Sequence, residues 1–136
     1  MNVNIKWSGK QNFTGETING QLIPISPDKN EIEMISPPDL LLMSLGSCTG
    51  LFILPSAKAM GIELADFEIR VTGVKAETPP KLFDEINIFV KFVGNLNSTE
   101  ANAILEKAHE KCFVLKSLNP NIKINNFIEI ESPLQL

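Results

Sequence analysis

A continuous apolar segment from Leu40 to Leu54 constrains the fold of this 136-residue chain more than any other feature. Ser36 can cap a helix that begins at Pro37, and Asp39 complements the helix dipole in the first turn. Apolar residues then occupy nearly all sides of the helix, which predicts that it is buried rather than amphipathic. At 15 residues the segment is shorter than the ~20 that a membrane span needs. We expect a core helix of a protein that does not enter a membrane.

Pro55 and Gly61 should define the end of this helix. Proline lacks an N–H and collides with the preceding turn, so Pro55 should kink or end the helix. Gly61 then closes the segment. Small residues at positions 44, 46, 47 and 50 would let a neighbouring element approach closely.

Strand patterns flank the helix on both sides. Residues 3–7 alternate, and Asn19-Gly20 is a signal for a hairpin with a two-residue turn. Residues 67–72 and 86–93 also alternate, and the short connection between them favours antiparallel pairing. A second helix, capped by Ser98 or Thr99, and a strand over residues 122–130 complete the order βββ–α–ββ–α–β. This order predicts one α+β domain over residues 1–136, with antiparallel sheets and two long helices, the first of them buried.

The charge pattern excludes several kinds of partner. Twelve basic residues face sixteen acidic ones, for a net charge of −4, and Arg70 is the only arginine. Nucleic-acid-binding proteins usually cluster lysine and arginine on one face, whereas the lysines here are scattered. The first residues lack the apolar core of a signal peptide. We expect a cytoplasmic protein without a nucleic-acid partner.

Cys48 and Cys112 are the two cysteines, and each lies on a predicted helix. The residues alone leave two alternatives open: inert core thiols, or a redox pair brought together where the helices cross. His109 precedes Cys112 by three residues, and we expect it to be a half-exposed helix residue. The alternative is that it shifts the pKa of a cysteine thiol. A structural zinc site needs four ligands, often from closely spaced cysteine pairs, and no fourth ligand is obvious in this sequence. We therefore expect neither a metal nor a cofactor.

Two cysteine motifs resemble the OsmC/Ohr family of osmotically inducible and organic hydroperoxide resistance proteins. Residues 36–49 (SPPDLLLMSLGSCT) place a cysteine eleven residues after the helix-start proline, as that family does. The second cysteine, in Glu110–Val114, and the strand entry at Pro80–Ile88 also match. The resemblance covers most of the chain.

This resemblance implies an OsmC-like fold and an intertwined homodimer with active sites at the subunit interface. It further implies that Cys48 attacks the O–O bond of an organic hydroperoxide and becomes a sulfenic acid. Cys112 would then form a disulfide with Cys48, and a dithiol or lipoyl-type reductant would reopen it.

The chain departs from the peroxidase branches at the residues that activate the thiolate. The family's arginine would stand at Phe13, two residues before Gly15. The family's glutamate would directly follow the helix-start proline, where this chain has Pro38 and then Asp39. Phe13, Pro38 and Asp39 are therefore the expected substrate-pocket residues. An apolar pocket disfavours a thiolate, so we expect a raised Cys48 pKa unless Lys10 or the start of the second long helix compensates.

Three readings of the function follow. The first is an OsmC-like stress-response protein that acts as a thiol-dependent peroxidase through Cys48 and Cys112. The second is a binding or redox-sensing module on the same fold, whose apolar pocket takes a small acyl or aromatic ligand with little turnover. The third is a structural role in which both thiols are inert.

Overall fold

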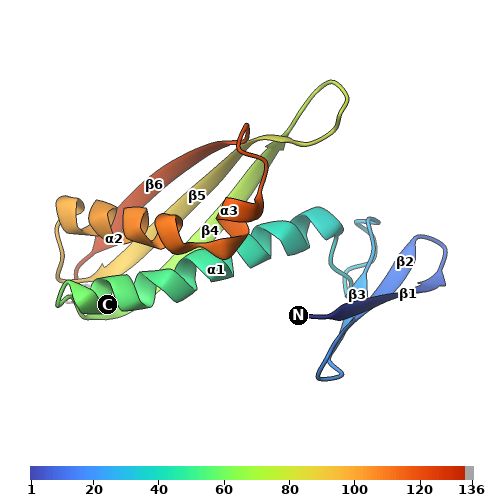
Figure 1. Ribbon diagram of the computed structural model, residues 1–136, viewed down its shortest axis with the longest axis horizontal. Coiled ribbons are helices and arrows are strands. Elements are labelled where there is room, and N and C mark those ends of the chain that lie inside the picture. Colours follow the sequence, from blue (N-terminus) through green and yellow to red (C-terminus); the bar gives the residue numbers. More distant parts are fainter. Residues whose placement is uncertain (134–136) are drawn as a thin grey trace. The chain divides into compact units, whose positions relative to one another are not determined.

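The computed structural model describes residues 1–133, which form two compact units with a boundary between Leu41 and Leu42. The described residues form six strands and three helices in the order βββ–α–ββ–αα–β, and Figure 1 labels these elements along the chain. The predicted α+β class is confirmed, and the additional helix is a short one of five residues directly after the second long helix.

The N-terminal unit contains a three-stranded antiparallel sheet. Its strands are β1 (Val3–Gly9), β2 (Asn12–Thr17) and β3 (Leu22–Ile25), paired in the order β1-β2-β3. The predicted hairpin lies between β2 and β3, but its loop has three residues, Ile18 to Gly20, instead of two. The Thr17 N–H bonds to Gln21 and the Gly20 N–H to Thr17, and Gly20 takes a positive φ of 83° that favours glycine.

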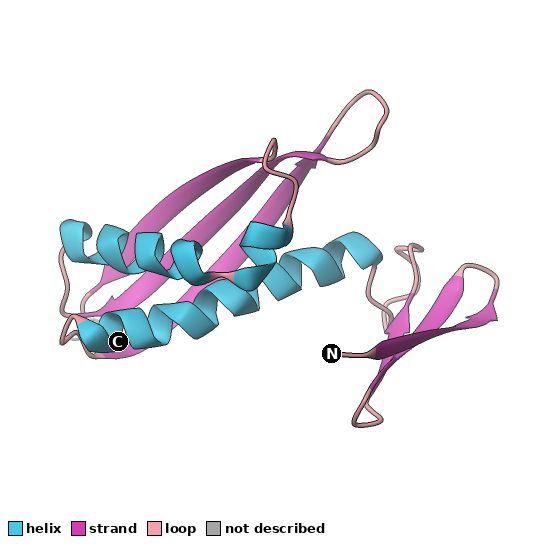
Figure 2. Ribbon diagram, viewed as in Figure 1, coloured by secondary structure: helices cyan, strands magenta, loops and turns pink. Residues whose placement is uncertain are grey.

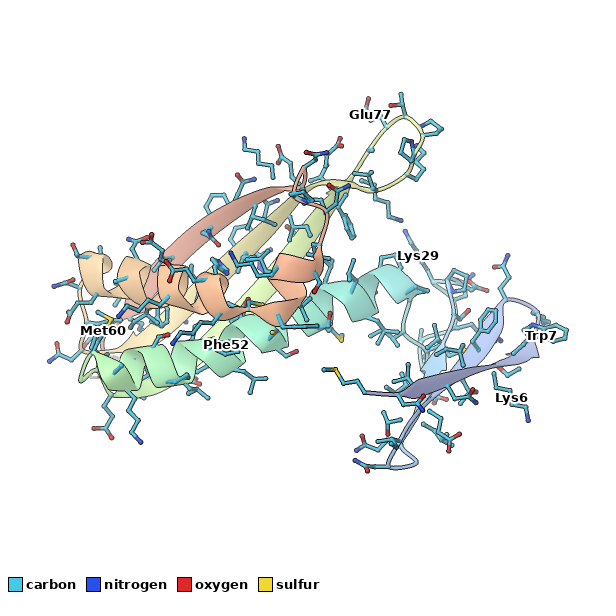
Figure 3. All side chains as sticks on the ribbon, viewed as in Figure 1. Lys6, Trp7, Lys29, Phe52, Met60 and Glu77 are labelled. Atoms are coloured by element: carbon cyan, nitrogen blue, oxygen red, sulfur yellow. The ribbon has the colours of Figure 1, made fainter. Side chains whose placement is uncertain are left out.

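One face of this N-terminal sheet is apolar. The pairing register sets Trp7 opposite Phe13 and Phe13 opposite Ile25, so their side chains share a face. The apolar face comprises Val3, Ile5, Trp7, Phe13, Ile23 and Ile25. Figure 3 labels Trp7 and Lys6, which follow one another along β1 and belong to opposite faces. Several of these side chains are exposed, Trp7 at 65%.

The second sheet consists of β4 (Leu64–Lys75), β5 (Phe83–Gly94) and β6 (Lys123–Glu131). β4 and β5 are antiparallel, as predicted, and Glu77 lies in the loop that joins them (Figure 3). β6 runs parallel to β5, which differs from the expected antiparallel pairing. The long connection through the second helix explains the difference, because parallel neighbours need a crossover that a short hairpin cannot provide.

Helices cover one face of this second sheet (Figure 2). They are α1 (Pro37–Ala59), α2 (Ser98–Lys111) and α3 (Phe113–Ser117). Large side chains from β5, α1 and α2 form a common buried core, with Phe52 and Met60 (Figure 3) packed against it. The largest fully buried side chains include Leu45, Ile53, Ile86, Ile88, Val90, Phe92 and Ile104.

The start and end of α1 follow the sequence signals, but Pro55 does not end it. The Asp39 N–H donates to Ser36 Oγ at 3.2 Å, and the helix begins at Pro37 as predicted. Pro55 lies inside the helix, which continues to Ala59. The Ile62 N–H then bonds to Ala57 and the Gly61 N–H to Lys58, with Gly61 at φ +70°. These paired bonds form a Schellman motif that satisfies the last carbonyls.

Only one side of α1 is buried, contrary to the expectation of burial all round. Small and apolar residues such as Leu45, Gly46 and Gly50 pack inward. Met43, Leu51 and Leu54 form an apolar row on the other side and are 55–66% exposed. The helix is also longer than the apolar segment suggested, and by length and composition it would pass as a membrane span. In the most apolar stretch of α1, 33% is buried, and the buried side packs in the core described above.

Asn97, rather than Ser98 or Thr99, caps α2. Its side chain accepts from the Glu100 N–H at 2.8 Å, and the Glu100 carboxylate accepts from the Asn97 N–H at 3.0 Å. This reciprocal capping box satisfies two N–H groups that have no partner within the helix. The shift by one residue is small, and the helix itself lies where the sequence predicts it.

Candidate functional site

α1 holds Cys48 beside the buried core. Thr49, the next residue, is fully buried, and its hydroxyl donates to the Leu45 carbonyl at 3.0 Å. Gly46 and Gly50 lie on the same buried side, where an added Cβ would contact side chains of β4. Cys48 itself is partly exposed and free. The local sequence therefore fixes the backbone at Cys48 while leaving its thiol accessible.

Cys112 lies at a break between helices, not in the middle of one as predicted. α2 ends at Lys111, Cys112 adopts an extended conformation (φ −68°, ψ 108°), and α3 begins at Phe113. The Cys112 side chain is fully buried, and its sulfur accepts a hydrogen bond from the Leu115 N–H at 3.4 Å. A new helix start leaves its first N–H groups without carbonyl partners. The break thus supplies backbone donors next to the sulfur.

The structure brings Cys48 and Cys112 together and makes them unequal. Burial raises the pKa of the Cys48 thiol, but three hydrogen bonds outweigh burial and lower it: from the Val114 N–H, the Cys112 side chain and the Phe113 N–H. Burial raises the pKa of Cys112, and the neighbouring Cys48 raises it further. The Thr49 hydroxyl lies 4.0 Å from the Cys112 sulfur. Of the two thiols, Cys48 is therefore the one that loses its proton more readily, and Cys112 the one that keeps it.

This inequality suits a two-step redox reaction. A thiolate is the nucleophilic form of cysteine, and a protonated neighbour stabilises it by donating a hydrogen bond. The same neighbour is in place to react once the first sulfur has been oxidised. The expectation that Cys48 would have a raised pKa is therefore wrong, because hydrogen bonds from the backbone groups after Cys112 and from the Cys112 side chain outweigh the effect of burial.

The remaining predicted pocket residues belong to the N-terminal unit. Phe13 lies on β2 within the apolar sheet face, directly across from Trp7. Pro38 and Asp39 occupy the first turn of α1, where Asp39 bonds the capping Ser36 through its backbone. In the structure the backbone of Asp39 takes part in the capping of α1.

Arg70 is not among the groups that shift the pKa of Cys48. It lies on β4 between Ile69 and Val71, whose side chains would meet a Cβ added at Gly46 of α1, so its own side chain lies on the opposite face of the sheet. There its guanidinium stacks over Phe89 at 4.1 Å from the ring centroid, in a hollow of about 270 Å³. The interaction is a cation–π contact on the sheet surface.

His109 is directed toward β6. Its Nε2 lies 2.8 Å from Asn126 Oδ1, and its pKa is lowered, chiefly by burial. It is not among the groups that shift the pKa of either cysteine. Within residues 1–133, no cluster of three or more histidine, cysteine or acidic side chains could hold a metal ion.

Sequence reasoning missed the backbone donors of Phe113 and Val114. They were hidden because a helical pattern runs through Cys112 without interruption, and no glycine or proline marks the break. Thr49 was also missed as a neighbour of Cys112. Its place beside Cys48 in a run of small residues was the one available signal.

Comparison with known proteins identifies the family and the fold. A family model described as "OsmC-like protein" matches residues 29–126. Protein YhfA of Escherichia coli is 24% identical over 132 residues, which cover 96% of this chain and 98% of YhfA. The crystal structure of a hypothetical protein from Aquifex aeolicus has a TM-score of 0.83 and 27% identity, with 96% of each chain covered.

An organic hydroperoxide resistance protein, OsmC of Legionella pneumophila, shares the fold. Its TM-score is 0.76 at 23% identity, and the match covers 95% of this chain and 97% of that one. The family model spans well over half of the sequence, including both cysteines. The chain therefore belongs to the OsmC-like protein family.

Proposed function

We propose that this protein reduces organic hydroperoxides, with Cys48 as the attacking thiolate and Cys112 as the resolving thiol. The observation that carries the proposal is the contact between Cys48 and Cys112 at the break between α2 and α3, where hydrogen bonds lower the pKa of Cys48 and burial raises that of Cys112. Membership of a stress-response family supports it, as does the fold shared with a Legionella protein named for organic hydroperoxide resistance.

The reaction balances with a hydroperoxide as oxidant and a dithiol as reductant. The Cys48 thiolate attacks one oxygen of ROOH, the O–O bond breaks, and the alkoxide takes up a proton to leave as ROH. Cys48 is then a sulfenic acid. The Cys112 thiol attacks that sulfur, which forms a disulfide and releases water. A dithiol or lipoyl-type reductant restores both thiols by exchange.

Two single variants test the proposal. Reduced protein is mixed with cumene hydroperoxide, and loss of peroxide and of thiols is followed against free cysteine. We expect the wild type to lose two thiols per peroxide much faster than cysteine does, and Cys48→Ser to lose this reactivity. Cys112→Ser should stop after one turnover with a sulfenic acid that dimedone traps. Unchanged peroxide consumption by Cys48→Ser would overturn the proposal.

A second candidate function is binding of a small apolar ligand with little turnover. Phe13 favours it, because an aromatic ring stands across from Trp7 where the peroxidases have a charge. Native mass spectrometry and thermal shifts with fatty acids and small aromatic compounds test this candidate. If no ligand is retained and none stabilises the protein, the candidate is eliminated.

We further propose that the protein is a cytoplasmic homodimer. Proteins of the OsmC/Ohr family are dimers, and this chain exposes two apolar surfaces that a second copy would bury. One is the apolar face of the N-terminal sheet, and the other is the row of Met43, Leu51 and Leu54 on α1. Exposed apolar surfaces of this kind are typical of interfaces.

A further inference from the structure

A hydrogen bond joins the end of α2 to β6, close to the cysteine pair. His109 occupies the last turn of α2, three residues before Cys112. Its Nε2 lies 2.8 Å from Oδ1 of Asn126 on β6. Its other ring nitrogen, Nδ1, is buried and has no hydrogen-bond partner among the described residues.

This arrangement determines the form of the imidazole ring. The Asn126 atom beside Nε2 is the amide oxygen, which can only accept a hydrogen bond, and the buried Nδ1 has no acceptor for a proton of its own. Nε2 therefore carries the proton and donates it to Asn126 Oδ1. The lowered His109 pKa, caused by burial and then by the nearby Lys116, agrees with a neutral ring. His109 thus acts as a fixed hydrogen-bond donor.

The segment after His109 carries the groups that hold Cys48. Cys112 has an extended backbone, and α3, from Phe113 to Ser117, has no fully buried residue. Val114 and Leu115 are only partly buried against the core. Such a short helix is weakly held by its own packing. The N–H groups of Phe113 and Val114 stay within hydrogen-bonding distance of Cys48 only if the end of α2 is held in place.

We infer that His109 is a positioning residue that, together with Asn126, ties the end of α2 to β6 and so holds Phe113 and Val114 against Cys48. The bond links a helix to a strand on opposite sides of the break at Cys112 in the sequence. Its loss would let the α2–α3 junction move relative to α1. The inference rests on the proposed function, because the position of these donors matters only where Cys48 reacts.

The hollow beside His109 does not favour a ligand site. His109 and Asn126 line a hollow of about 350 Å³ together with Glu106 and Lys116. The one ring nitrogen without a partner is buried, however, and so does not offer a ligand a contact in that hollow. The other nitrogen is already bonded to Asn126.

The test compares two substitutions of His109, by glutamine and by asparagine, whose amide side chains differ in length. Gln at position 109 places its side-chain NH₂ near the position of Nε2, and Asn is too short to do so. The pH profile of Cys48 alkylation by iodoacetamide, followed by mass spectrometry, reports the thiolate directly. We expect His109→Asn and Asn126→Ala to slow alkylation near neutral pH by roughly threefold to tenfold, through a raised Cys48 pKa. His109→Gln should stay near the wild type.

Two controls separate positioning from general destabilisation. Glu106→Gln changes a charge in the same hollow, and Ile104→Val trims the core side of the same helix. Both should leave the alkylation profile unchanged even if Ile104→Val lowers the melting temperature. The double variant His109→Asn/Asn126→Ala should be no slower than either single variant, because the two residues share one bond.

The inference fails if His109→Asn and Asn126→Ala keep the wild-type alkylation profile, or if His109→Gln is as slow as His109→Asn. It also fails if long-range ¹H–¹⁵N spectra of the folded wild type place the proton on Nδ1. None of these readouts uses a hydroperoxide. An inactive peroxidase with the expected alkylation shifts would therefore refute the proposed function and leave the positioning role intact.

Discussion

At the scale of single residues, the site depends on backbone donors that no side-chain motif reveals. By resemblance to the peroxidase branches, we expect Phe13 and Pro38 where those proteins carry an activating arginine and glutamate. Hydrogen bonds from the N–H groups of Val114 and Phe113, with one from Cys112, lower the Cys48 pKa instead. A backbone N–H survives most substitutions, which makes such donors insensitive to side-chain change.

Proline at position 113 should remove one of these donors without disturbing the helix. Cys112 is extended at ψ 108°, the conformation that favours a following proline, and Phe113 is the first residue of α3. Because Phe113→Pro loses its N–H, we expect a higher Cys48 pKa and slower alkylation near pH 7. Phe113→Ala keeps the N–H and is the control. Equal profiles for the two variants would contradict the prediction.

Protonation of His109 should weaken the protein in mild acid. Burial lowers its pKa in the folded state below the ~6.5 of an unfolded chain, with Lys116 adding to the effect. The unfolded state therefore takes up the proton first, and stability falls as the pH drops below about 6.5. Glu106 and Glu110 line the same hollow and face the solvent.

The comparison that isolates this effect uses His109→Gln. Urea unfolding of both proteins at about pH 7.5 and about pH 5.5 gives the change in unfolding free energy for each. We expect the wild type to lose more stability than the variant, because glutamine does not titrate. Parallel losses would show that His109 contributes nothing to the acid sensitivity.

At the scale of elements, α1 and β4 pack through two glycines that differ in the room around them. A Cβ at Gly46 would lie 3.1 Å from a Val71 methyl group, whereas one at Gly50 would meet Ile69 and Phe67 at 3.5 Å, an ordinary contact. Alanine favours a helix over glycine by up to about 1 kcal/mol. We expect Gly50→Ala to raise the free energy of unfolding by up to about that amount.

Gly46→Ala should be less stable than Gly50→Ala, because Val71 must shift to make room and this offsets the helix gain. The two variants are matched, since each adds one methyl group to the buried side of the same helix. Urea unfolding monitored by circular dichroism measures both. A Gly46→Ala protein at least as stable as Gly50→Ala would contradict the packing argument.

The elements also show what the sequence can and cannot predict. Ser36, Pro37 and Gly61 act through their immediate neighbours, so the ends of α1 were predictable. The parallel pairing of β6 depends on the path of a distant crossover, which no local pattern encodes. Cys112 was predicted as a site residue through resemblance, but the helix break that gives it donors was not. One exposed side of α1 was missed because a uniformly apolar helix carries no information about which side is covered.

At the scale of the whole molecule, the exposed apolar surfaces require an explanation. The alternation in β1 and β2 is that of strands with one buried face, yet Val3, Ile5 and Trp7 are each more than half exposed. Met43, Leu51 and Leu54 repeat this mismatch on α1. A second copy of the chain would bury both surfaces, which would account for apolar residues at positions that are exposed in a single copy.

Two glutamate substitutions on opposite faces of one sheet test the dimer. Ile5→Glu puts a charge on the apolar face, and Leu22→Glu puts the same charge on the other face of the same sheet, where Leu22 pairs with Glu16. Burying an unpaired charge in an interface is costly, so we expect Ile5→Glu to sediment as a monomer or to dissociate at a much higher concentration. Leu22→Glu should remain a dimer. Sedimentation velocity over a dilution series measures both, and a monomeric wild type would refute the dimer outright. If instead both variants stay dimeric, the interface uses the α1 row without the sheet face, and Leu51→Glu becomes the decisive variant.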